Sequence, residues 1–355
     1  MPLKVLVFAD KFLPREQWEM AFKEKMGEEY KKVEFTFYNL EEDDPSWIGR
    51  PSYKGVKEFF GNPLMIAKQA EKFDVLIVQF APVTEEVYET AKNLKLVACN
   101  RSTPVNVDVE GASKRKIPII NTPGRNADSV ADFTMGLILC EVRHIARAFE
   151  AVRNGTYLES SKRWRKSIPE LKDKTIGIVG FGKIGTKVAE RAKGFSMKVL
   201  AYDPFVSEEK IRQYGGEKVG LDELLTRSDF VTIHMRLTPQ TTKMIGKREI
   251  SLMKKTAFLI NTSRGEVIDE DALYEALVDK SIAGAALDVF VKEPIYSDPN
   301  NRFLHLDNIT FTPHLAGPSD DMFYRGACMI AEDLARFLRG ERMENVMNRD
   351  ALKQS

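Results

Sequence analysis

The sequence has almost no excess of charge of one sign, and it contains few cysteines and histidines. Lysine and arginine together number 53 and aspartate and glutamate 52, so the formal net charge is +1. Without a basic excess, neither nucleic acid nor an anionic membrane is an expected partner. The three cysteines, Cys99, Cys140 and Cys328, show neither metal-ligand spacing nor a disulfide framework. We therefore expect no metal site and a reducing, cytoplasmic compartment.

Long apolar runs are missing as well. The N-terminal run KVLVF, at 4–8, is typical of a strand and is too short for a signal peptide or a membrane span. Instead, short runs rich in valine and isoleucine recur along the chain, with helical patterns between them. Continuous apolar strands separated by helices favour a parallel sheet that is covered on both faces.

The short runs fall into two series, which predict two α/β domains. The first series comprises 4–8, 33–38, 74–80, 94–99 and 117–120, with helices at 62–72 and 84–93. The second comprises 175–180, 198–203, 229–235, 257–262, 283–290 and 308–313. Long helices are expected at 126–153, between the series, and at 320–340. The charged runs at 41–44 and 162–166 are expected to be surface loops.

A glycine-rich stretch, GIVGFGKIG at 177–185, opens the second series. Its three glycines have the G-x-G-x-x-G spacing, with a strand pattern before them and a helical pattern after them. The next strand pattern ends in an aspartate, with 17 residues between the last glycine and this acid. In such a loop the glycines make the turn, admit a pyrophosphate and let helix and strand pack closely, while the acid accepts hydrogen bonds from a ribose diol. The pattern predicts NAD contacts at Gly180, Gly182, Lys183, Ile184, Gly185 and Asp203. A glycine-rich turn without a ligand is the alternative.

Three further stretches follow, each at the end of a strand of the second series. They read INTSRGEVIDEDAL (260–273), ALDVFVKEP (286–294) and TPHLAG (312–317). With the glycine loop, and in this order, they resemble the NAD-dependent D-2-hydroxyacid dehydrogenase family, in particular its phosphoglycerate dehydrogenase-like branch. The resemblance covers most of the chain and is strongest over about 95–317. The N-terminal 75 residues match only in pattern.

The resemblance implies three catalytic residues. Arg264 would orient the substrate, His314 would be the acid/base, and Glu293 would be the partner of that histidine. The chemistry of these residue types agrees, because reduction of a 2-oxo acid needs a cation for the carboxylate and a proton donor that titrates near neutrality. A carboxylate beside the histidine stabilises its charged form and fixes its tautomer.

Other positions in the motifs are also expected to contact NAD: Thr262, Ser263, Asp288 and Gly317. His234 ends a strand on the cofactor side and is expected to touch NAD, although no acid partner is evident. The remaining two histidines have plainer expectations. His144 is expected inside the long helix, and His305 is expected to face solvent.

The fold implied by the resemblance is α/β, with two Rossmann-like, doubly wound parallel-sheet domains, of which the substrate domain is discontinuous. Residues 1–122 and 313–355 would form the substrate domain, and 123–312 the NAD domain. Members of the family usually dimerise through the NAD domain, so a homodimer is expected. The chain ends soon after its last helix, so no C-terminal regulatory domain is expected.

Two departures from the family pattern concern the substrate. Phosphoglycerate dehydrogenases typically carry an Arg-Ser pair where this chain has Gln79 and Phe80, so a phosphate ester would be poorly bound. The family's glycine-rich substrate loop reads NRSTPVNVD here, at 100–108. Its polar side chains predict contacts to a polar or hydroxylated 2-oxo acid from Asn100, Arg101 and Ser102. Alternatively, these side chains turn away and backbone N–H groups hold the substrate carboxylate.

Other functions stay open at this point. D-3-phosphoglycerate dehydrogenase is the main alternative, and formate dehydrogenase fits less well because those enzymes pair their histidine with a glutamine rather than with a glutamate such as Glu293. A different class is an NAD-sensing corepressor on the same fold, since relatives of that kind retain the catalytic residues. No partner-docking extension is evident in the sequence, which favours the enzyme.

Overall fold

The computed structural model describes residues 2–41, 51–156 and 169–353, and these form two compact units. Unit 1 comprises Met1–Arg125 with Ser319–Ser355, and unit 2 comprises Asn126–Pro318. The second boundary lies six residues beyond the expected one, because residues 314–317 bond to side chains of unit 2. The run at 162–166 and most of that at 41–44 lie outside the described residues.

Unit 1 is built on a five-stranded parallel sheet with the order β2-β1-β3-β4-β5. Its strands are β1 (Leu3–Ala9), β2 (Val33–Asn39), β3 (Val75–Val78), β4 (Leu96–Cys99) and β5 (Ile119–Ile120). Its helices are α1 (Arg15–Met26), α2 (Pro63–Ala70), α3 (Glu85–Thr90), α4 (Val109–Lys114), α13 (Asp320–Leu338) and α14 (Arg349–Lys353), with the 3₁₀ helix η1 (Gly27–Lys32).

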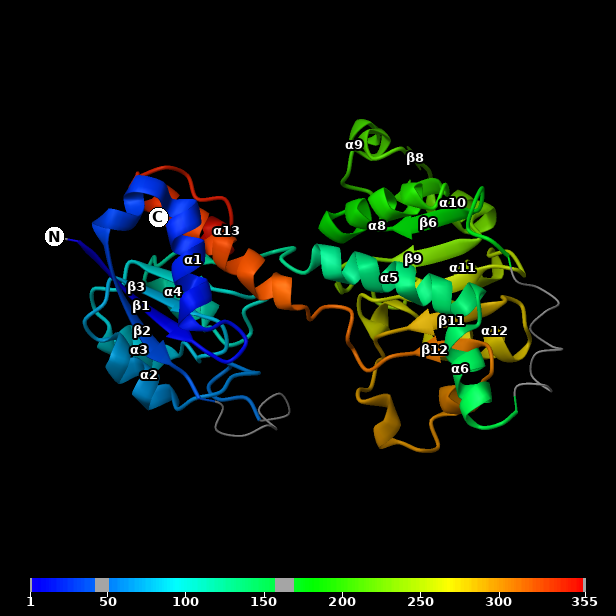
Figure 1. Ribbon diagram of the computed structural model, residues 1–355, viewed down its shortest axis with the longest axis horizontal. Coiled ribbons are helices and arrows are strands. Elements are labelled where there is room, and N and C mark those ends of the chain that lie inside the picture. Colours follow the sequence, from blue (N-terminus) through cyan, green and yellow to red (C-terminus); the bar gives the residue numbers. More distant parts are fainter. Residues whose placement is uncertain (1, 42–50, 157–168, 354–355) are drawn as a thin grey trace. The chain divides into compact units, whose positions relative to one another are not determined.

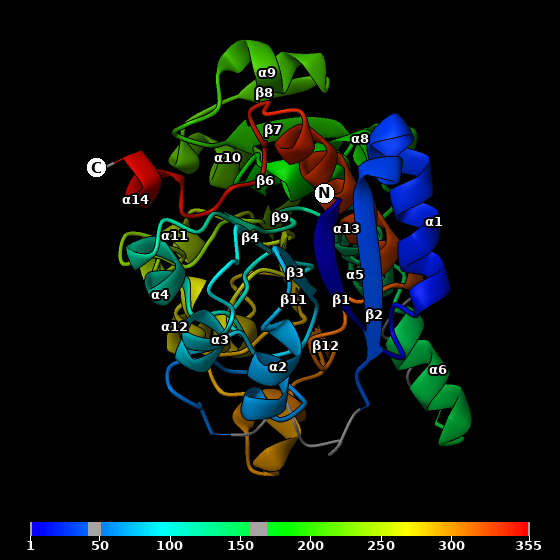
Figure 2. The same cartoon turned by 90° about the vertical axis from the view of Figure 1, so that its left-hand side faces the viewer.

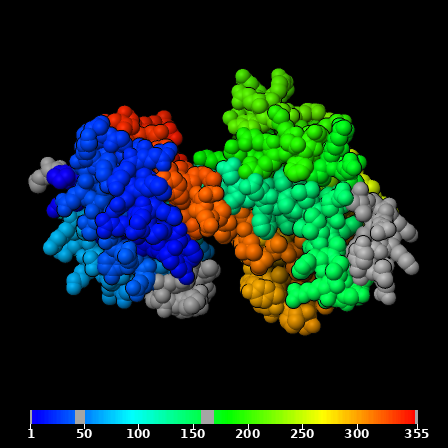
Figure 3. Space-filling view, viewed as in Figure 1, coloured from blue at the N-terminus to red at the C-terminus, as the bar shows by residue number. Residues whose placement is uncertain are grey.

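Alternation along β1 shows how this sheet is covered on both faces. Leu6 and Phe8 pack with α2, α3 and α4, whereas Val5 and Val7 pack with α1 and α13 on the opposite face. Successive side chains of a strand point to opposite faces, so a continuous apolar run is what a two-sided core requires. Figures 1 and 2 show α1 beside α13, and Figure 3 shows the two ends of the chain sharing the surface of unit 1.

Unit 2 has a seven-stranded parallel sheet with the order β12-β11-β10-β9-β6-β7-β8. Its strands are β6 (Thr175–Val179), β7 (Lys198–Tyr202), β8 (Gly216–Lys218), β9 (Phe230–Ile233), β10 (Phe258–Asn261), β11 (Gly284–Leu287) and β12 (Ile309–Phe311). The strand order reverses between β6 and β9, and ligands of doubly wound sheets bind at such a switch point, at the carboxyl ends of the strands. Both sheets confirm the predicted fold class.

Helices cover both faces of the unit 2 sheet. One apolar core lies under α5 (Ala127–Val142) and α8 (Lys183–Gly194), which run side by side in Figure 1. The other lies under α10 (Leu221–Arg227), α11 (Lys247–Ser251) and α12 (Glu270–Val278). The remaining elements are α6 (Ile145–Arg153), α9 (Glu208–Gln213) and the 3₁₀ helices η3 (Gly265–Val267), η4 (Ile295–Ser297) and η5 (Arg302–His305).

The single long helix expected at 126–153 was wrong. The structure has two helices, α5 and α6, and His144 lies between them in the left-handed conformation, with φ 56°. After this break, Arg147 reaches back to the buried Glu141 at 2.8 Å and to the carbonyl of Asp307 at 2.6 Å. The turn therefore allows the buried carboxylate of Glu141 to pair with Arg147. Helical periodicity in the sequence does not reveal such a pairing. Among the described residues, no helix has the length and apolarity to cross a membrane.

Candidate active site

The glycine loop joins β6 to α8 at the switch point of unit 2. Gly180 has φ 96°, and a methyl group there would lie 2.9 Å from the backbone of His234. At Gly185 it would lie 2.3 Å from the carbonyl oxygen of Gly180, so helix and strand approach too closely for any side chain. At Gly182 it would meet nothing within 4 Å, and no side chain caps the first turn of α8. This uncapped, open helix end fits the phosphates of a dinucleotide.

Asp203 follows β7 and its carboxylate is half-buried beside this loop. One oxygen accepts the N–H of Phe181 at 2.9 Å, and the other accepts the N–H of Phe205 at 2.8 Å. A carboxylate offers about four acceptor sites, so it can hold the glycine loop in place and still accept from a hydroxyl. This position is consistent with the expected ribose contact.

His234 lies across the switch point, after β9. Its backbone N–H donates to the carbonyl of Val179 at 2.8 Å, and its Nε2 lies 2.9 Å from the hydroxyl of Thr232. Burial of the ring lowers the pKa of His234 to about 3, so the imidazole is neutral near pH 7. Among the described residues, no acid contacts the ring, and Nδ1 has no hydrogen-bond partner. The ring is therefore not the acid/base of the site.

The loop after β10 is braced by a buried asparagine. The side chain of Asn261 donates to the carbonyl of Arg264 at 2.8 Å and accepts the N–H of Ser263 at 3.0 Å. A methyl group on Gly265 would lie 2.1 Å from the backbone of Phe290, so this loop packs directly on the next one. Arg264 is exposed, and no carboxylate of the described residues pairs with it. Its guanidinium is thus available to an anionic ligand.

Thr262 and Ser263 precede this arginine. The hydroxyl of Thr262 lies 3.2 Å from that of Thr134 on α5, and the hydroxyl of Ser263 donates to Asn261 at 2.7 Å. Both side chains are thus engaged within unit 2. Their contact to NAD stays a prediction.

His314 and Glu293 meet at the carboxyl edge of the same sheet. Nδ1 of His314 lies 2.8 Å from a carboxylate oxygen of Glu293, whose other oxygen accepts the N–H of Phe290 at 3.0 Å. The side chains are 48% and 35% exposed, respectively, so the pair is open to a ligand. Because Nδ1 is held by the carboxylate, Nε2 is the ring nitrogen left to contact a ligand.

Asp288 organises the backbone that carries this histidine. It is 1% exposed, and its carboxylate accepts the N–H groups of Leu315 at 2.8 Å and Ala316 at 2.9 Å. The hydroxyl of Thr312 donates to it as well, and the carbonyl of Asp288 accepts the N–H of His314. His314 itself has φ 58°, an uncommon conformation for histidine. Asp288, which the motif suggested as a cofactor contact, holds the left-handed turn at His314, a role that its place in the sequence did not show.

Gly317 closes the same turn from the other side. Its carbonyl and that of Ala316 both accept from the hydroxyl of Ser129 on α5, at 2.7 and 2.9 Å. The turn is thus fixed at both ends by side chains of unit 2. A contact between Gly317 and NAD stays a prediction.

In unit 1, the three side chains expected to read the substrate are all bonded to other parts of the chain. The amide of Asn100, fully buried, donates to Gln79 at 2.9 Å and to the carbonyl of Phe323 at 3.1 Å. Arg101 pairs with the carboxylate of Glu58 and also donates to its carbonyl. The hydroxyl of Ser102 donates to the carbonyl of Thr122 at 3.0 Å.

The backbone of this loop is less engaged. Within the described residues, the N–H groups of Ser102 and Thr103 donate to no acceptor of the chain. The geometry thus favours the alternative in which backbone N–H groups hold the substrate carboxylate.

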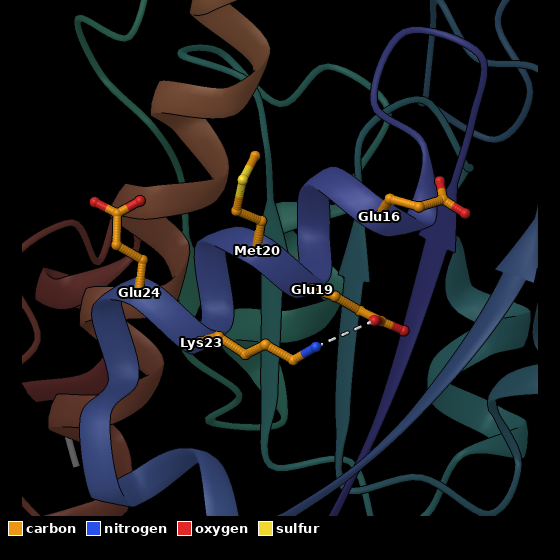
Figure 4. A pocket seen from close by; sticks show the side chains of 5 residues that line it. All are labelled: Glu16, Glu19, Met20, Lys23 and Glu24. Atoms are coloured by element: carbon orange, nitrogen blue, oxygen red, sulfur yellow. Dashed lines mark ion pairs between the residues drawn. The ribbon is translucent and has the colours of Figure 1, made fainter.

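A hollow elsewhere in unit 1 does not form a catalytic site. A hollow on α1, shown in Figure 4, is lined by Glu16, Glu19, Met20, Lys23 and Glu24. These side chains come from one helix, and Lys23 already pairs with Glu19 at 3.6 Å. No group of three or more acids, cysteines and histidines in the described part of the chain is arranged to hold a metal.

Comparison with known proteins connects this geometry to a family. Residues 135–316 match the profile of the D-isomer specific 2-hydroxyacid dehydrogenase NAD-binding domain. A glyoxylate reductase of Korarchaeum cryptofilum is 40% identical over 290 residues, which cover 81% of this chain and 87% of the relative. The chain belongs to the D-isomer specific 2-hydroxyacid dehydrogenases. This dehydrogenase is an NAD-dependent oxidoreductase that interconverts 2-hydroxy acids and 2-oxo acids.

Other relatives carry different substrate names. A hydroxypyruvate reductase of Thermotoga maritima is 38% identical over 274 residues, covering 77% of the dehydrogenase and 87% of the relative. A D-3-phosphoglycerate dehydrogenase of Methanocaldococcus jannaschii is 41% identical over 283 residues, which cover 79% of the dehydrogenase but 53% of that longer protein. Similar overall identity therefore goes with different substrate names.

Solved structures agree on the fold. A D-lactate dehydrogenase from a Sporolactobacillus species aligns with a TM-score of 0.75 and 26% identity, covering 98% of this dehydrogenase and 99% of the neighbour. The D-mandelate dehydrogenase of Rhodotorula graminis aligns with a TM-score of 0.78 at 22% identity, covering 98% and 97%. The second likeness concerns the fold alone.

Proposed function

We propose that His314, Glu293 and Arg264 carry out the reduction of a 2-oxo acid to a D-2-hydroxy acid. The observation that carries this proposal is the exposed contact of 2.8 Å between His314 and Glu293, on a turn held by the buried Asp288. A histidine at a strand end is unremarkable by itself. A histidine whose ring is oriented by an acid and whose second nitrogen is open has the arrangement of a general acid/base.

Each residue has one task in this mechanism. The planar guanidinium of Arg264 binds the substrate carboxylate and orients the neighbouring carbonyl group. Nε2 of the charged His314 donates a proton to the carbonyl oxygen as it becomes a hydroxyl, and Glu293 stabilises the imidazolium before that transfer. NADH, when bound at the glycine loop, supplies the hydride. In the reverse reaction the neutral imidazole accepts the hydroxyl proton.

The substrate is proposed to be a polar or hydroxylated 2-oxo acid. The polar loop at 100–103 supports this class, and its two unbonded N–H groups suit a carboxylate. D-3-Phosphoglycerate dehydrogenase is the second candidate, because a relative of that name is 41% identical. An NAD-sensing corepressor is a further alternative, which would bind NAD but show negligible turnover.

A substrate panel tests the proposed function. Purified protein is mixed with NADH and, separately, glyoxylate, hydroxypyruvate, pyruvate and 3-phosphohydroxypyruvate, and NADH oxidation is followed. We expect the highest kcat/KM with a hydroxylated or otherwise polar 2-oxo acid. NADH binding without turnover of any of these acids would contradict the enzyme and favour the corepressor class.

We also propose that the dehydrogenase forms a homodimer through α6 and functions in the cytoplasm. Ile145, Phe149 and Val152 lie on one face of α6, at helical spacing, and are 51%, 67% and 64% exposed. Exposed apolar patches of this kind mark association surfaces. The three free cysteines support a reducing compartment.

Light scattering after gel filtration tests the homodimer. The wild type should have the mass of two chains, and Phe149→Glu should shift it to one. Phe205→Glu, at a 95% exposed position of the same unit, is the matched control and should stay dimeric. A monomeric wild type would contradict the homodimer.

A further inference from the structure

Unit 1 has its own topological switch point, which the proposed mechanism does not use. The strand order β2-β1-β3-β4-β5 reverses between β1 and β3, and ligands of such sheets bind beyond the carboxyl ends of the strands at this place. Asp10 follows β1 and Gln79 follows β3, and the amide of Gln79 donates to the carboxylate of Asp10 at 3.1 Å. The two side chains are 7% and 0% exposed. The polar groups at this switch point are therefore buried.

Three aromatic rings line the same edge of the sheet. Phe12 contacts Phe80 with ring centroids 5.5 Å apart, and contacts Phe323 of α13 at 5.6 Å. An arginine lies against each end of this aromatic cluster. Arg101 lies over Phe80 at 5.5 Å, and Arg125 lies over Phe323 at 5.2 Å. Apolar rings flanked by cations are suited to a ligand with an apolar body and an anionic group.

The two arginines differ in how their charge is compensated. Arg101 pairs with Glu58, as described above. Arg125 is only 7% exposed, and in the described part of the chain its guanidinium makes no hydrogen bond and no ion pair. Its Nη1 has no hydrogen-bond partner at all. Burial lowers the pKa of Arg125 to about 10, so the side chain is still a cation at neutral pH.

The carboxylate of Asp10 acts on this cation without bonding to it. Asp10 acts on Arg125 only through its charge, with no contact within 4.0 Å. The Asp10 carboxylate is occupied by the N–H groups of Phe12 and Leu13 and by Gln79. A buried cation without a hydrogen-bonded partner is costly, and proteins retain one where an anion completes it.

Helix α13 packs closely on Asn100 and Arg125 at Gly326. Gly326 lies inside α13, where glycine is less favourable than alanine. A methyl group at this position would lie 3.1 Å from Cδ of Arg125 and 1.8 Å from the amide oxygen of Asn100. The glycine therefore leaves space mainly for the amide of Asn100, and Cδ of Arg125 lies close beside it.

We propose that Arg125 is the anchor of an anion-binding subsite in unit 1, at the switch point beside Phe12 and Phe323. The ligand is a small molecule with a carboxylate or phosphate group that completes the hydrogen bonds of the guanidinium. The rings of Phe12 and Phe323 pack against the carbon chain of that ligand. Resting on the proposed function, this subsite makes the preferred substrate a 2-oxo acid with a second anionic group.

Calorimetric titration without NADH tests the subsite independently of turnover. Succinate and inorganic phosphate are titrated into the wild type, Arg125→Met and Arg115→Met, with acetate as the singly charged reference. Arg115 is an arginine of the same unit that already pairs with Glu85, so it is the matched control. We expect the wild type and Arg115→Met to bind at least one of the two dianions, and Arg125→Met to bind it at least about tenfold more weakly, the scale of one lost charge-assisted contact.

Three outcomes would overturn the subsite: a wild type that binds neither dianion, an Arg125→Met variant that binds like the wild type, or equal losses in both variants. Thermal unfolding separates a structural role. Without an anion, Arg125→Met should melt at or above the wild-type temperature, because it removes an uncompensated buried charge. A lower melting temperature with unchanged binding would make the arginine structural. If Arg125→Met fails to fold, Arg125→Lys replaces it, since it keeps the charge and loses the planar fork.

Turnover connects the subsite to the substrate class. In Arg125→Met, kcat/KM for 2-oxoglutarate or 3-phosphohydroxypyruvate should fall at least about tenfold while that for glyoxylate stays within about twofold. The first arm tests a carboxylate and the second a phosphate. Loss of dianion binding in a protein that turns over no 2-oxo acid would uphold the subsite and contradict the proposed function. Turnover that falls equally for all substrates in Arg125→Met would contradict the subsite and uphold the proposed function.

Discussion

The polar side chains at the carboxyl edges of the two sheets differ in their exposure and in their bonding partners. In unit 2 the groups proposed for chemistry are exposed, and buried partners hold the loops that carry them: Asp288 beneath His314 and Asn261 beneath Arg264. In unit 1 the side chains expected to contact the substrate are bonded to each other or to the backbone. Asn100 is bonded to Gln79, for example, and Arg125 is left as a buried cation without an ion pair among the described residues.

We infer from this difference that unit 2 carries the reaction and that unit 1 recognises the substrate. Chemistry at His314 requires an accessible nitrogen in a fixed place, so its supporting carboxylate is buried and the ring is not. In our proposal, recognition by unit 1 relies on backbone N–H groups and on one uncompensated charge. Substitutions in unit 2 should therefore act on turnover, and substitutions in unit 1 on the choice of substrate.

The largest effect is expected at His314. His314→Gln keeps a polar side chain but cannot donate a proton as an imidazolium, so kcat should fall at least about a hundredfold. NADH binding, followed by fluorescence, should be unchanged. His305→Gln removes an exposed histidine of the same unit and should retain full activity. A similar loss in both variants would remove His314 from its proposed role.

The next effect is expected at the buried carboxylate beneath the histidine. Asp288→Asn replaces one acceptor oxygen with a donor that faces the N–H of either Leu315 or Ala316. It should lower the free energy of unfolding by about 1–3 kcal/mol, the cost of an unsatisfied buried group. It should also lower kcat by about tenfold by displacing His314. An exposed control, Asp298→Asn, should change neither quantity, and a normal melting temperature for Asp288→Asn would refute the supporting role.

A moderate effect is expected on the choice of cofactor. The wild type should prefer NADH, because the carboxylate of Asp203 repels the 2′-phosphate of NADPH. Asp203→Asn keeps an acceptor for the N–H of Phe181 and removes the charge. The ratio of kcat/KM for NADPH over NADH should rise about tenfold, equivalent to about 1.4 kcal/mol. A wild type that favours NADPH would contradict this prediction.

The smallest effect is expected at Arg101. Because Arg101 is paired with Glu58, Arg101→Ala should lower kcat/KM a few-fold for large and small 2-oxo acids alike, through the loop that it supports. Glu58→Gln should reproduce that loss. A selective loss of about 1.5–3 kcal/mol for a larger substrate, with glyoxylate untouched, would instead show that Arg101 reads the substrate.

Sequence patterns predicted local features well and distant partners poorly. The glycine loop, the motif of each strand end and the strands other than β8 depend on neighbouring residues, and the structure places them where they were expected. The short edge strand β8 was not predicted. The supporting role of Asp288 was missed because its partners lie 27 and 28 residues away. Asn100 was assigned to the substrate because nothing near it in the chain shows its bond to Phe323, 223 residues away. No sequence pattern indicated that Arg125 would be buried, because an arginine in a loop is normally exposed.

The pH dependence of Glu293→Gln tests the central claim most directly, namely that an exposed histidine held by its partner carboxylate donates the proton. Reduction of the best 2-oxo acid is measured from pH 5 to 9 in the wild type and the variant. Removing the anion 2.8 Å from Nδ1 makes the imidazolium less stable, so the alkaline limb of kcat/KM should move to lower pH. A limb that stays in place, with only the rate reduced, would contradict the account.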